Sequence, residues 1–301
     1  MKLITRLQNE LPTERLLLDE PMSRHTSFRI GGAADALFMP ATAEELTRAI
    51  AAAEESDAPW RVLGNGTNVL VRDGGLRGLT IVLGEPMSGV RIEGQRITAE
   101  AGALLSRVGR EAQHAGLAGM AALSGIPGSV GGAAAMNAGA YGSEMKDVLA
   151  RALVLQNGQA VWMDADALEL SYRDSIVLRQ GLIVLSVEFE LKRGDPEAIQ
   201  AEMADYALRR RTKQPLSMPS AGSTFKRPAG HFAGALIEGA GLKGYRVGGA
   251  QVSDMHAGFV VNAGGATARD VLALMDDVRR IVFEQTGVTL EPEVRVIGEE
   301  G

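Results

Sequence analysis

Residues 124–142 have the sequence SGIPGSVGGAAAMNAGAYG, a run that is almost free of large side chains. Glycine has no Cβ, so such a run lets the backbone approach a bulky planar ligand closely. The entropy that glycine loses on folding is hard to explain without a ligand, although each glycine cluster taken alone is typical of ordinary tight turns. The candidate binding residues of this loop are Gly125, Pro127, Gly128, Ser129, Gly131, Gly132, Asn137 and Gly139.

A second glycine loop, LGNGTNVLVRDGG from Leu63, directly follows a short β-type run, WRVLG. Glycines at this place let consecutive backbone N–H groups turn inward and form an anion nest, and neighbouring amide and hydroxyl side chains add hydrogen bonds. A diphosphate is the natural ligand. The loop lacks the third glycine of a dinucleotide-binding Rossmann motif, and the chain has no Walker A motif. The candidate residues of this loop are Gly64, Asn65, Gly66, Thr67 and Asn68.

Composition narrows the class of protein. A length of 301 residues favours two or three compact units, and a net charge of −6 argues against a nucleic-acid binder. The chain has no cysteine and only four scattered histidines, so we expect no protein metal site. Charges at Lys2, Arg6 and Glu10 interrupt any apolar segment typical of a signal peptide, so we expect a cytoplasmic protein. Residues 115–143 are uncharged but rich in Gly and Ala, so we expect no membrane insertion.

The pattern of elements predicts an α+β fold. Thr42, with Glu45 three residues later, is typical of the start of a helix over residues 43–56. Two hairpins are expected in VRIEGQRITAEAG and ALVLQNGQAVWMD, with a helix in LLSRVGREAQHAG between them and a further strand in LIVLSVEFEL. A later helix is expected to start at Pro196. Thr267 and Asp270 are expected to cap a second helix, which stops at Gly287, and a strand in EVRVIG follows it. We expect domains at residues 1–83, 84–193 and 194–301.

Seven motifs occur in order along the chain and carry a resemblance to a known family. They are TSFRIGG (26–32), LGNGTNVLVRDGG (63–75), GIPGSVGGAAAMNAGAYG (125–142), SYRDS (171–175), AGSTFK (221–226), AGLKGYRVGGAQVS (240–253) and LEPEVRVIG (290–298). From about Leu18 onward, the chain closely resembles the UDP-N-acetylenolpyruvoylglucosamine reductase family.

The resemblance implies a fold of the vanillyl-alcohol-oxidase type, with a two-lobed FAD-binding domain and a C-terminal α+β substrate domain. It also implies the activity. NADPH reduces bound FAD, and hydride then passes to C3 of the enolpyruvyl group of UDP-N-acetylglucosamine enolpyruvate, giving UDP-N-acetylmuramate for peptidoglycan synthesis. The acidic surface pattern permits a monomer, which we expect.

The resemblance also implies three catalytic residues. Ser223 of AGSTFK matches the family's proton donor to C2, Arg173 of SYRDS supplies a planar cation suited to a carboxylate, and Glu293 of EPEVR matches the catalytic glutamate. Each has a plain alternative when its motif is read alone. Ser223 fits a turn serine, Arg173 fits a surface ion pair with Asp174 or Glu169, and Glu293 fits a solvated strand end.

On the substrate side the resemblance implies binding residues Lys213, Lys226, Lys243, His256 and Asn262. Lys213 is equally consistent with the solvated end of a basic helix, and His256 with a core histidine. Arg227 stands where many relatives have asparagine, which removes one expected substrate hydrogen bond. The short segment after Tyr141 resembles the branch of the family that lacks a tyrosine flap.

Two other functions share the flavin loops. A flavin oxidase for a sugar or alcohol would not need Ser223, Arg173 and Glu293 together. A flavin or sugar-nucleotide sensor would keep the glycine loops and let Ser223 vary.

Overall fold

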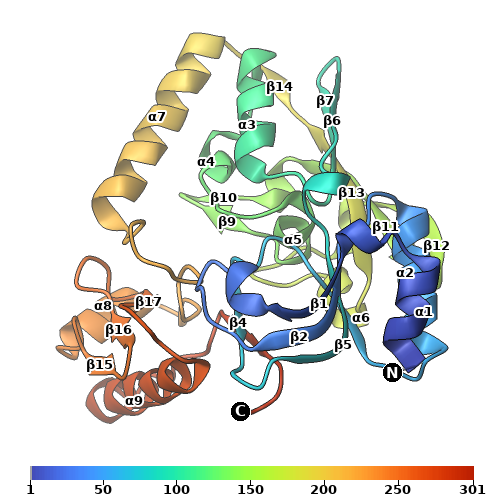
Figure 1. Cartoon of the computed structure of the whole chain (residues 1–301). Helices are drawn as coiled ribbons and strands as arrows, with labels where there is room; N and C mark the ends of the chain where they lie inside the picture. Colours follow the sequence, from blue (N-terminus) through green and yellow to red (C-terminus); the bar gives the residue numbers. More distant parts are fainter. Residues whose placement is uncertain (1) are drawn as a thin grey trace. The chain divides into compact units, whose positions relative to one another are not determined.

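The computed structural model describes residues 2–301; Met1, at which the first expected domain begins, lies outside the described residues. The chain forms two compact units (Figure 1). The first unit contains the chain up to Leu16, Phe38–Asn65 and Thr80–Arg209, and the second contains Leu17–Leu37, Gly66–Leu79 and Arg210–Gly301. The three consecutive domains expected above remain a prediction. The boundaries of the compact units differ from them, because strand pairing joins residues 69–71 to residues 295–297.

A four-stranded sheet carries the N-terminal part of the chain. Its order is β1-β2-β5-β3, and β1, β2 and β5 each continue from one unit into the other. The expected strand in WRVLG is confirmed as β3. The elements are β1 (Leu16–Pro21), β2 (Ala33–Phe38), β3 (Trp60–Leu63) and β5 (Leu76–Val82), with α1 (Lys2–Glu10) and α2 (Ala43–Glu54) packed on each other in the first unit.

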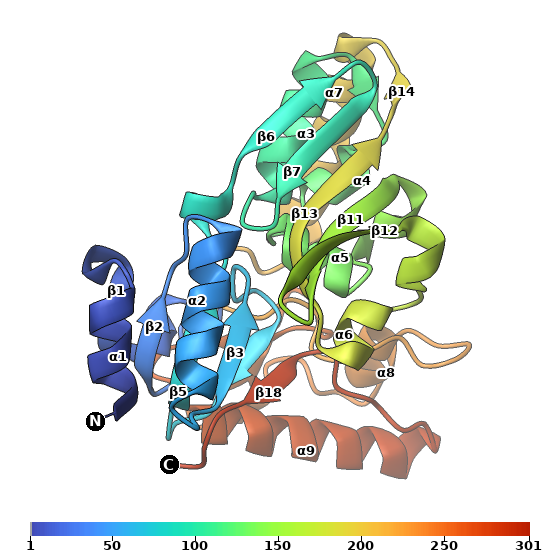
Figure 2. The ribbon, with the colours of Figure 1, turned by 90° about the vertical axis from the view of Figure 1, so that its right-hand side faces the viewer.

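The first unit is built on a five-stranded antiparallel sheet of order β12-β11-β13-β7-β6 (Figure 2). Both expected hairpins are confirmed. The first turns between Glu93 and Arg96, and the second turns at Asn157-Gly158, where both residues have positive φ. The strands are β6 (Val90–Glu93), β7 (Arg96–Glu100), β11 (Leu149–Gln156), β12 (Gln159–Asp164) and β13 (Ile183–Glu190).

Further helices and two short strand pairs begin in the part of the chain that forms the first unit. The glycine-rich stretch after residue 115 forms two short helices and a small hairpin, and α5 packs on β13 and β7. The elements are α3 (Leu105–His114), α4 (Ala121–Ser124), α5 (Val130–Ala135), α6 (Ile176–Gln180) and α7 (Pro196–Lys213), with the short pairs β8 (Leu117–Ala118) and β14 (Lys192–Arg193), and β9 (Gly139–Ala140) and β10 (Ser143–Glu144).

Both tryptophans of the chain lie in the first unit. The indole N–H of Trp60 in β3 donates to Glu54 at 3.3 Å. Trp162 in β12 is 40% exposed, and the guanidinium carbon of Arg151 lies 4.4 Å from the centre of its ring. Trp162 therefore packs against a cation on its own sheet rather than inside a core.

The second unit has an apolar core beneath α9 (Ala268–Thr286). The helix is capped at both ends as expected, by the Thr267–Asp270 capping box and by Gly287 at φ 71°. Its apolar face buries Val271, Leu274, Met275, Val278 and Val282. The remaining elements are α8 (Ala233–Gly239), the antiparallel strands β15 (Arg246–Val247), β16 (Ala250–Val252) and β17 (Val260–Asn262), and the parallel pair β4 (Val69–Val71) and β18 (Arg295–Ile297).

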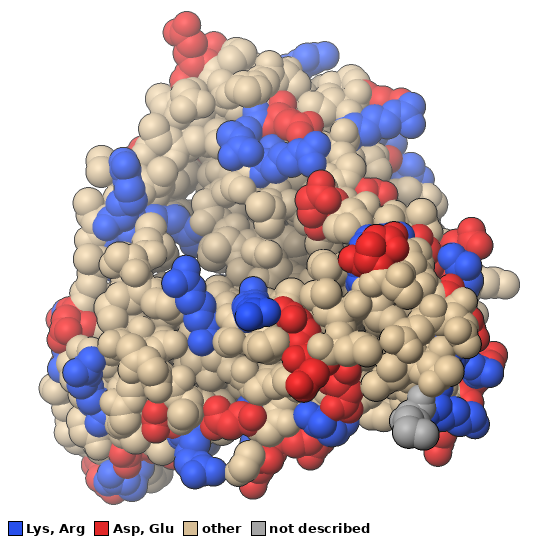
Figure 3. Space-filling view, in the orientation of Figure 1, with Lys and Arg blue, Asp and Glu red and all other residues tan. Residues whose placement is uncertain are grey.

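Among residues 2–301, none of the helices combines the length and the apolar composition needed to cross a membrane. On the face displayed in Figure 3, basic and acidic side chains are interspersed.

The N-terminus of α2 departs from the simplest capping arrangement. Thr42 Oγ1 accepts the backbone N–H of Glu45 at 3.1 Å, so the expected cap is confirmed. The Glu45 carboxylate does not complete a capping box. It accepts two bonds from the Arg15 guanidinium, at 2.6 and 2.8 Å, and one from the Ala41 N–H at 2.7 Å. These bonds, the Arg15 pair first, lower the pKa of Glu45 from 4.5 to about 2.

The Glu45→Gln variant is expected to lose about 1 kcal/mol of unfolding free energy at pH 7, a value reduced for solvent screening near the surface. Because folding lowers the pKa of Glu45, its contribution is complete above pH 4.5 and disappears as the pH falls towards 2. Urea unfolding followed by circular dichroism should therefore separate the two proteins at pH 7 and bring them together in acid. Glu44→Gln, at the exposed neighbouring position, is the control; an equal loss there would contradict the assignment.

Candidate active site

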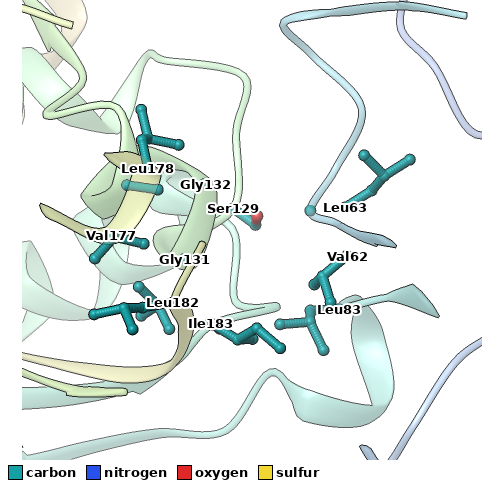
Figure 4. Close-up of a pocket in the computed structure, with 14 residues that line it drawn as sticks. Val62, Leu63, Leu83, Ser129, Gly131, Gly132, Val177, Leu178, Leu182 and Ile183 are labelled. Carbon is teal, nitrogen blue, oxygen red and sulfur yellow. The ribbon is translucent and has the colours of Figure 1, made fainter. Parts of the chain in front are cut away.

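The first unit contains a mostly apolar cleft (Figure 4). Val62, Leu63 and Leu83 form one wall, and residues of α6 and the start of β13 form the other. The floor comes from the glycine-rich stretch around α5. The residues that line the cleft are Val62, Leu63, Gly64, Leu83, Ala101, Ser129, Gly131, Gly132, Ala135, Val177, Leu178, Leu182, Ile183 and Val184. Such walls suit a planar, largely apolar ring.

One polar group faces this cleft without a partner. Ser129 is 2% exposed, and its buried Oγ has no hydrogen bond to any group within residues 2–301. A buried hydroxyl without a partner costs free energy, and a ligand that bonds to it removes that cost. A Cβ added at Gly64 would stand 2.4 Å from this oxygen. The space beside Ser129 therefore depends on glycine at position 64.

Four of the expected flavin-loop residues, Gly64, Ser129, Gly131 and Gly132, line the cleft together. The other expected residues do not line it. Asn65, Gly125 and Pro127 are exposed, and Gly128 uses its carbonyl to accept the Leu105 N–H. Gly66, Thr67 and Asn68 belong to the second unit. Their flavin-binding role remains a prediction.

Asn137 is fully buried, and its side chain joins three segments of the first unit. Its Nδ2 donates to Glu144 Oε2 and to the Ser171 carbonyl, both at 3.0 Å, and its Oδ1 accepts the Lys146 N–H at 3.0 Å. Its φ of 41° lies in the left-handed region that asparagine tolerates. With these bonds in place, the amide holds the β9–β10 hairpin against the SYRDS turn.

Arg173 lies on that SYRDS turn with a left-handed φ of 57°. Such a conformation in a non-glycine residue is strained and is often found at functional sites. Its Nη2 lies 3.5 Å from the Gly139 carbonyl, and its guanidinium carbon lies 5.0 Å from the centre of the Tyr172 ring. The two carboxylates that the sequence offered as its surface partners, Asp174 and Glu169, both pair with Arg179.

Tyr141, in the turn of the β9–β10 hairpin, is 39% exposed and has a φ of 54°. Its ring stacks on that of Tyr206 in α7, with the centres 4.8 Å apart and an angle of 23° between the planes. Stacking fixes the direction of this turn. Tyr141 is therefore held against a helix of its own unit.

In the second unit the segment of Ser223 runs beside that of Glu293. Thr224 O accepts the Glu293 N–H at 2.8 Å, and Phe225 pairs with Pro292. Ser223 is exposed and follows Gly222, whose φ of 77° turns the chain. Asn68 Nδ2 donates to the Glu293 carbonyl at 3.2 Å. The structure thus brings two of the three expected catalytic residues into adjacent segments of the chain. Their convergence with Arg173, which lies in the first unit, remains a prediction.

Four of the five expected substrate residues, Lys226, Lys243, His256 and Asn262, have protein partners in the second unit. Asn262 Nδ2 donates to the Phe28 carbonyl at 3.3 Å, while its Oδ1 accepts the N–H groups of Gly264 and Ala266. Lys243 pairs with Glu238 at 2.6 Å, and Lys226 lies 3.4 Å from Glu291.

The other positions near the expected substrate site are Lys213, His256 and Arg227. Lys213 is exposed at the end of α7. His256 is half-buried, and its Nδ1 accepts the Gly258 N–H at 3.1 Å, which fits a core histidine. Arg227 places its guanidinium carbon 4.3 Å from the centre of the Phe232 ring.

Sequence reasoning missed the apolar walls of the cleft. One wall is formed by residues that come soon after SYRDS, and the sequence indicated only a strand and the segment that leads to it there. These residues are Val177, Leu178, Leu182, Ile183 and Val184. The available signal was the apolar run SIVLRQGLIV next to a motif that carries a candidate catalytic residue.

Models of two known protein domains match this chain. The model of an FAD binding domain matches residues 34–164, which include both glycine loops. The model of the C-terminal domain of UDP-N-acetylenolpyruvoylglucosamine reductase matches residues 214–297. The chain is therefore a flavin-binding protein with an added C-terminal domain.

Relatives cover the whole chain. UDP-N-acetylenolpyruvoylglucosamine reductase of Alkaliphilus oremlandii is 49% identical over 301 residues, 100% of this chain and 99% of its own, and that of Agathobacter rectalis is 50% identical over 96% of each. The crystal structure of the Thermus caldophilus reductase has 39% identity and a TM-score of 0.80, covering 93% of this chain and 97% of its own.

This chain belongs to the UDP-N-acetylenolpyruvoylglucosamine reductase family. The expected α+β fold is confirmed, with an FAD-binding domain and the C-terminal domain of this family. Its cofactor is FAD, and the cleft fits that group: apolar walls suit the ring system, and the Ser129 hydroxyl offers a bond that no group of residues 2–301 satisfies.

Gly64→Ala is expected to lower FAD affinity by at least about tenfold, because its methyl group would displace the Ser129 hydroxyl from the cleft. Flavin absorbance of the purified protein and fluorescence titration of the apoprotein measure this effect. Gly84→Ala is the matched control, since a Cβ there would meet only Val82, at 3.9 Å. Full flavin content in Gly64→Ala would contradict the placement of the cofactor.

Proposed function

We propose that this chain reduces the enolpyruvyl ether of UDP-N-acetylglucosamine enolpyruvate to UDP-N-acetylmuramate, a step of peptidoglycan synthesis, with NADPH as reductant. The observation that carries this proposal is the full-length similarity to reductases of this name, together with a cleft that fits FAD. Bound FAD, reduced by NADPH, supplies the hydride that C3 receives.

Ser223 is proposed to donate the proton that C2 receives. Addition of hydride at C3 leaves negative charge at C2, which spreads into the neighbouring carboxylate. A serine hydroxyl is a weak acid, so it donates only to a strong carbon base within hydrogen-bond reach. Its exposure and the turn at Gly222 support this role, because both leave the hydroxyl accessible to a ligand.

Arg173 and Glu293 are proposed to stabilise the charge that forms. The guanidinium of Arg173 is permanently charged, and its planar fork matches two carboxylate oxygens. A carboxylate at Glu293 would repel an anion, so Glu293 acts in its protonated form or through a water molecule. The pairing of Thr224 with Glu293 supports a shared role with Ser223.

The substrate diphosphate is proposed to bind Lys213, whose exposed position at the end of α7 leaves its ammonium group available to phosphate oxygens. Lys226, which lies 3.4 Å from Glu291, is proposed as a further substrate contact. Lys243, His256 and Asn262 are proposed to shape the sugar-nucleotide side. The amide of Asn262 already bonds three backbone groups, which supports a role in fixing its loop.

We also propose that the protein works as a monomer in the cytoplasm, where NADPH is available. Its well-patterned acidic surface supports the monomer. Light scattering of the purified protein at micromolar concentration gives the mass directly, and a mass of twice 31.8 kDa would contradict it.

One assay tests the reaction. The purified protein should be yellow, and it should consume NADPH faster when UDP-N-acetylglucosamine enolpyruvate is present. NADPH consumption that ignores this substrate would refute the proposed reaction. Consumption that depends on oxygen and on a sugar or alcohol would favour a flavin oxidase. Flavin binding without turnover would favour a sensor.

A further inference from the structure

The imidazole of His256 is held in one orientation by its surroundings in the second unit. Its Nδ1 lies 3.1 Å from the backbone nitrogen of Gly258, and its ring meets that of Phe259 edge to face at 5.0 Å. A Cβ at Gly234 would stand 3.2 Å from ring carbon Cε1, so α8 closes the other side. A backbone N–H can only donate, so Nδ1 accepts and the neutral ring carries its proton on Nε2.

A short chain of hydrogen bonds leads from this imidazole to the residue after Ser223. The carbonyl of Gly258 accepts the Thr224 N–H at 2.9 Å, and Thr224 Oγ1 accepts the Val260 N–H at 2.9 Å. Thr224 is 3% exposed, so these bonds form away from solvent. Its carbonyl in turn accepts the Glu293 N–H at 2.8 Å. Thr224 thus links the 256–260 segment to both expected catalytic residues of this unit.

We infer that neutral His256 is a positioning residue for proton donation, fixing Ser223 through Gly258 and the buried backbone N–H of Thr224, whose hydroxyl holds the same segment at Val260. This inference rests on the proposed function, in which Ser223 is the donor. To the proposed place of His256 on the sugar-nucleotide side it adds a role in holding the AGSTFK segment. Thr224 has the same role at the next step of the chain.

Protonation of His256 would turn its acceptor into a donor that faces the Gly258 N–H. Burial is the first cause that lowers the pKa of His256 below 6.5; nearby Lys243 lowers it further, and Glu238 and a backbone hydrogen bond oppose the shift. Lys243 and Glu238 pair with each other at 2.6 Å. The ring is therefore neutral at pH 7. Its contribution to positioning and to stability is complete above pH 6.5 and is lost as the pH falls through the lowered pKa.

Rapid-mixing measurements between pH 5 and pH 8 test the inference. Protein reduced by NADPH is mixed with the enolpyruvyl substrate, and flavin reoxidation is followed by absorbance. In His256→Asn the amide oxygen replaces Nδ1 as acceptor and does not titrate. We expect its rate to be about threefold to tenfold lower than that of the wild type and to lack the His256-dependent loss in acid. His256→Gln moves the acceptor away from Gly258 and should lose more than tenfold at every pH.

Thr224 provides a second, matched pair of variants. Thr224→Ser keeps the acceptor for the Val260 N–H and should stay within about threefold of the wild type. Thr224→Val keeps the shape but leaves that N–H without a partner, and should slow reoxidation by about tenfold or more. His114→Asn, at an exposed position of α3 in the first unit, is the histidine control and should keep the wild-type pH profile.

Two results would overturn the inference. One is a His256→Asn protein that keeps the full acid-side loss of the wild type. The other needs no variant: ¹⁵N spectra of histidine-labelled wild-type protein at pH 7 that show the proton on Nδ1 of His256. Failure of the proposed function looks different, because wild-type protein would then not be reoxidised by the enolpyruvyl substrate at any pH.

Discussion

Ser223→Ala is expected to keep the rate of flavin reduction by NADPH within about twofold of the wild type and to slow reoxidation by the enolpyruvyl substrate by about 10²- to 10⁴-fold, the usual contribution of a general acid. The hydroxyl is needed only when C2 takes its proton, so the loss is confined to the second half-reaction. Rapid mixing of each half-reaction separately measures it. Flavin content should not change, because Ser223 is not among the residues that line the flavin cleft.

Ser217→Ala is the matched control for this variant, since Ser217 is exposed and precedes the AGSTFK motif on the same segment of the second unit. It should retain both half-reactions. An equal loss of both half-reactions in Ser223→Ala would indicate a damaged fold. Normal reoxidation would exclude Ser223 as the proton donor and leave it as an ordinary turn serine.

Arg173→Gln is expected to slow reoxidation by about 10²- to 10³-fold, the cost of removing one group that stabilises developing negative charge. Arg173→Lys should recover only part of that rate, because an ammonium group keeps the charge but lacks the planar fork. Both variants place another L-residue at a φ of 57°, so the backbone strain is similar in the two proteins. The kcat of turnover with saturating NADPH and the single-turnover reoxidation rate should fall together.

Arg179→Gln is the control for the arginine variants. Arg179 lies a few residues further along the same segment and pairs with Glu169 and Asp174, so its loss should affect stability more than rate. A rate loss in Arg179→Gln as large as that in Arg173→Gln would show that the effect comes from the fold of the SYRDS turn and not from the Arg173 guanidinium.

Local sequence signals predicted the elements well. Helix ends were predicted correctly at Thr42, Thr267 and Gly287. Hydroxyl caps and a left-handed glycine satisfy the free backbone groups at helix ends, and these hydrogen bonds are local in sequence. The Asn157-Gly158 turn likewise fixes its own hairpin. The helix that begins after Thr42 differed from its prediction only at its C-terminal end, because α2 ends at Glu54, two residues before the expected end.

Polar residues were harder to assign from the sequence. Asn137, Asn262 and Asn68 were all interpreted as ligand contacts, because an asparagine in a glycine-rich motif offers donors and acceptors. In the structure their amides bond to Ser171, Phe28 and Glu293 respectively, which lie 34, 234 and 225 residues away along the chain. Such distant partners leave no local signal. The sequence could show that these groups need partners, but not that the protein itself supplies them.

The position of the two tryptophans has a practical consequence for biophysical work on this protein. Trp60 and Trp162 both belong to the first unit, so indole emission reports on that unit alone. The second unit, which carries Ser223 and Glu293, has Tyr245 as an aromatic reporter, with its hydroxyl 2.9 Å from Asp277. An unfolding curve that follows tryptophan fluorescence at 350 nm would therefore miss separate unfolding of the second unit, which holds the proposed proton donor. A tryptophan introduced into the second unit would make that unfolding visible.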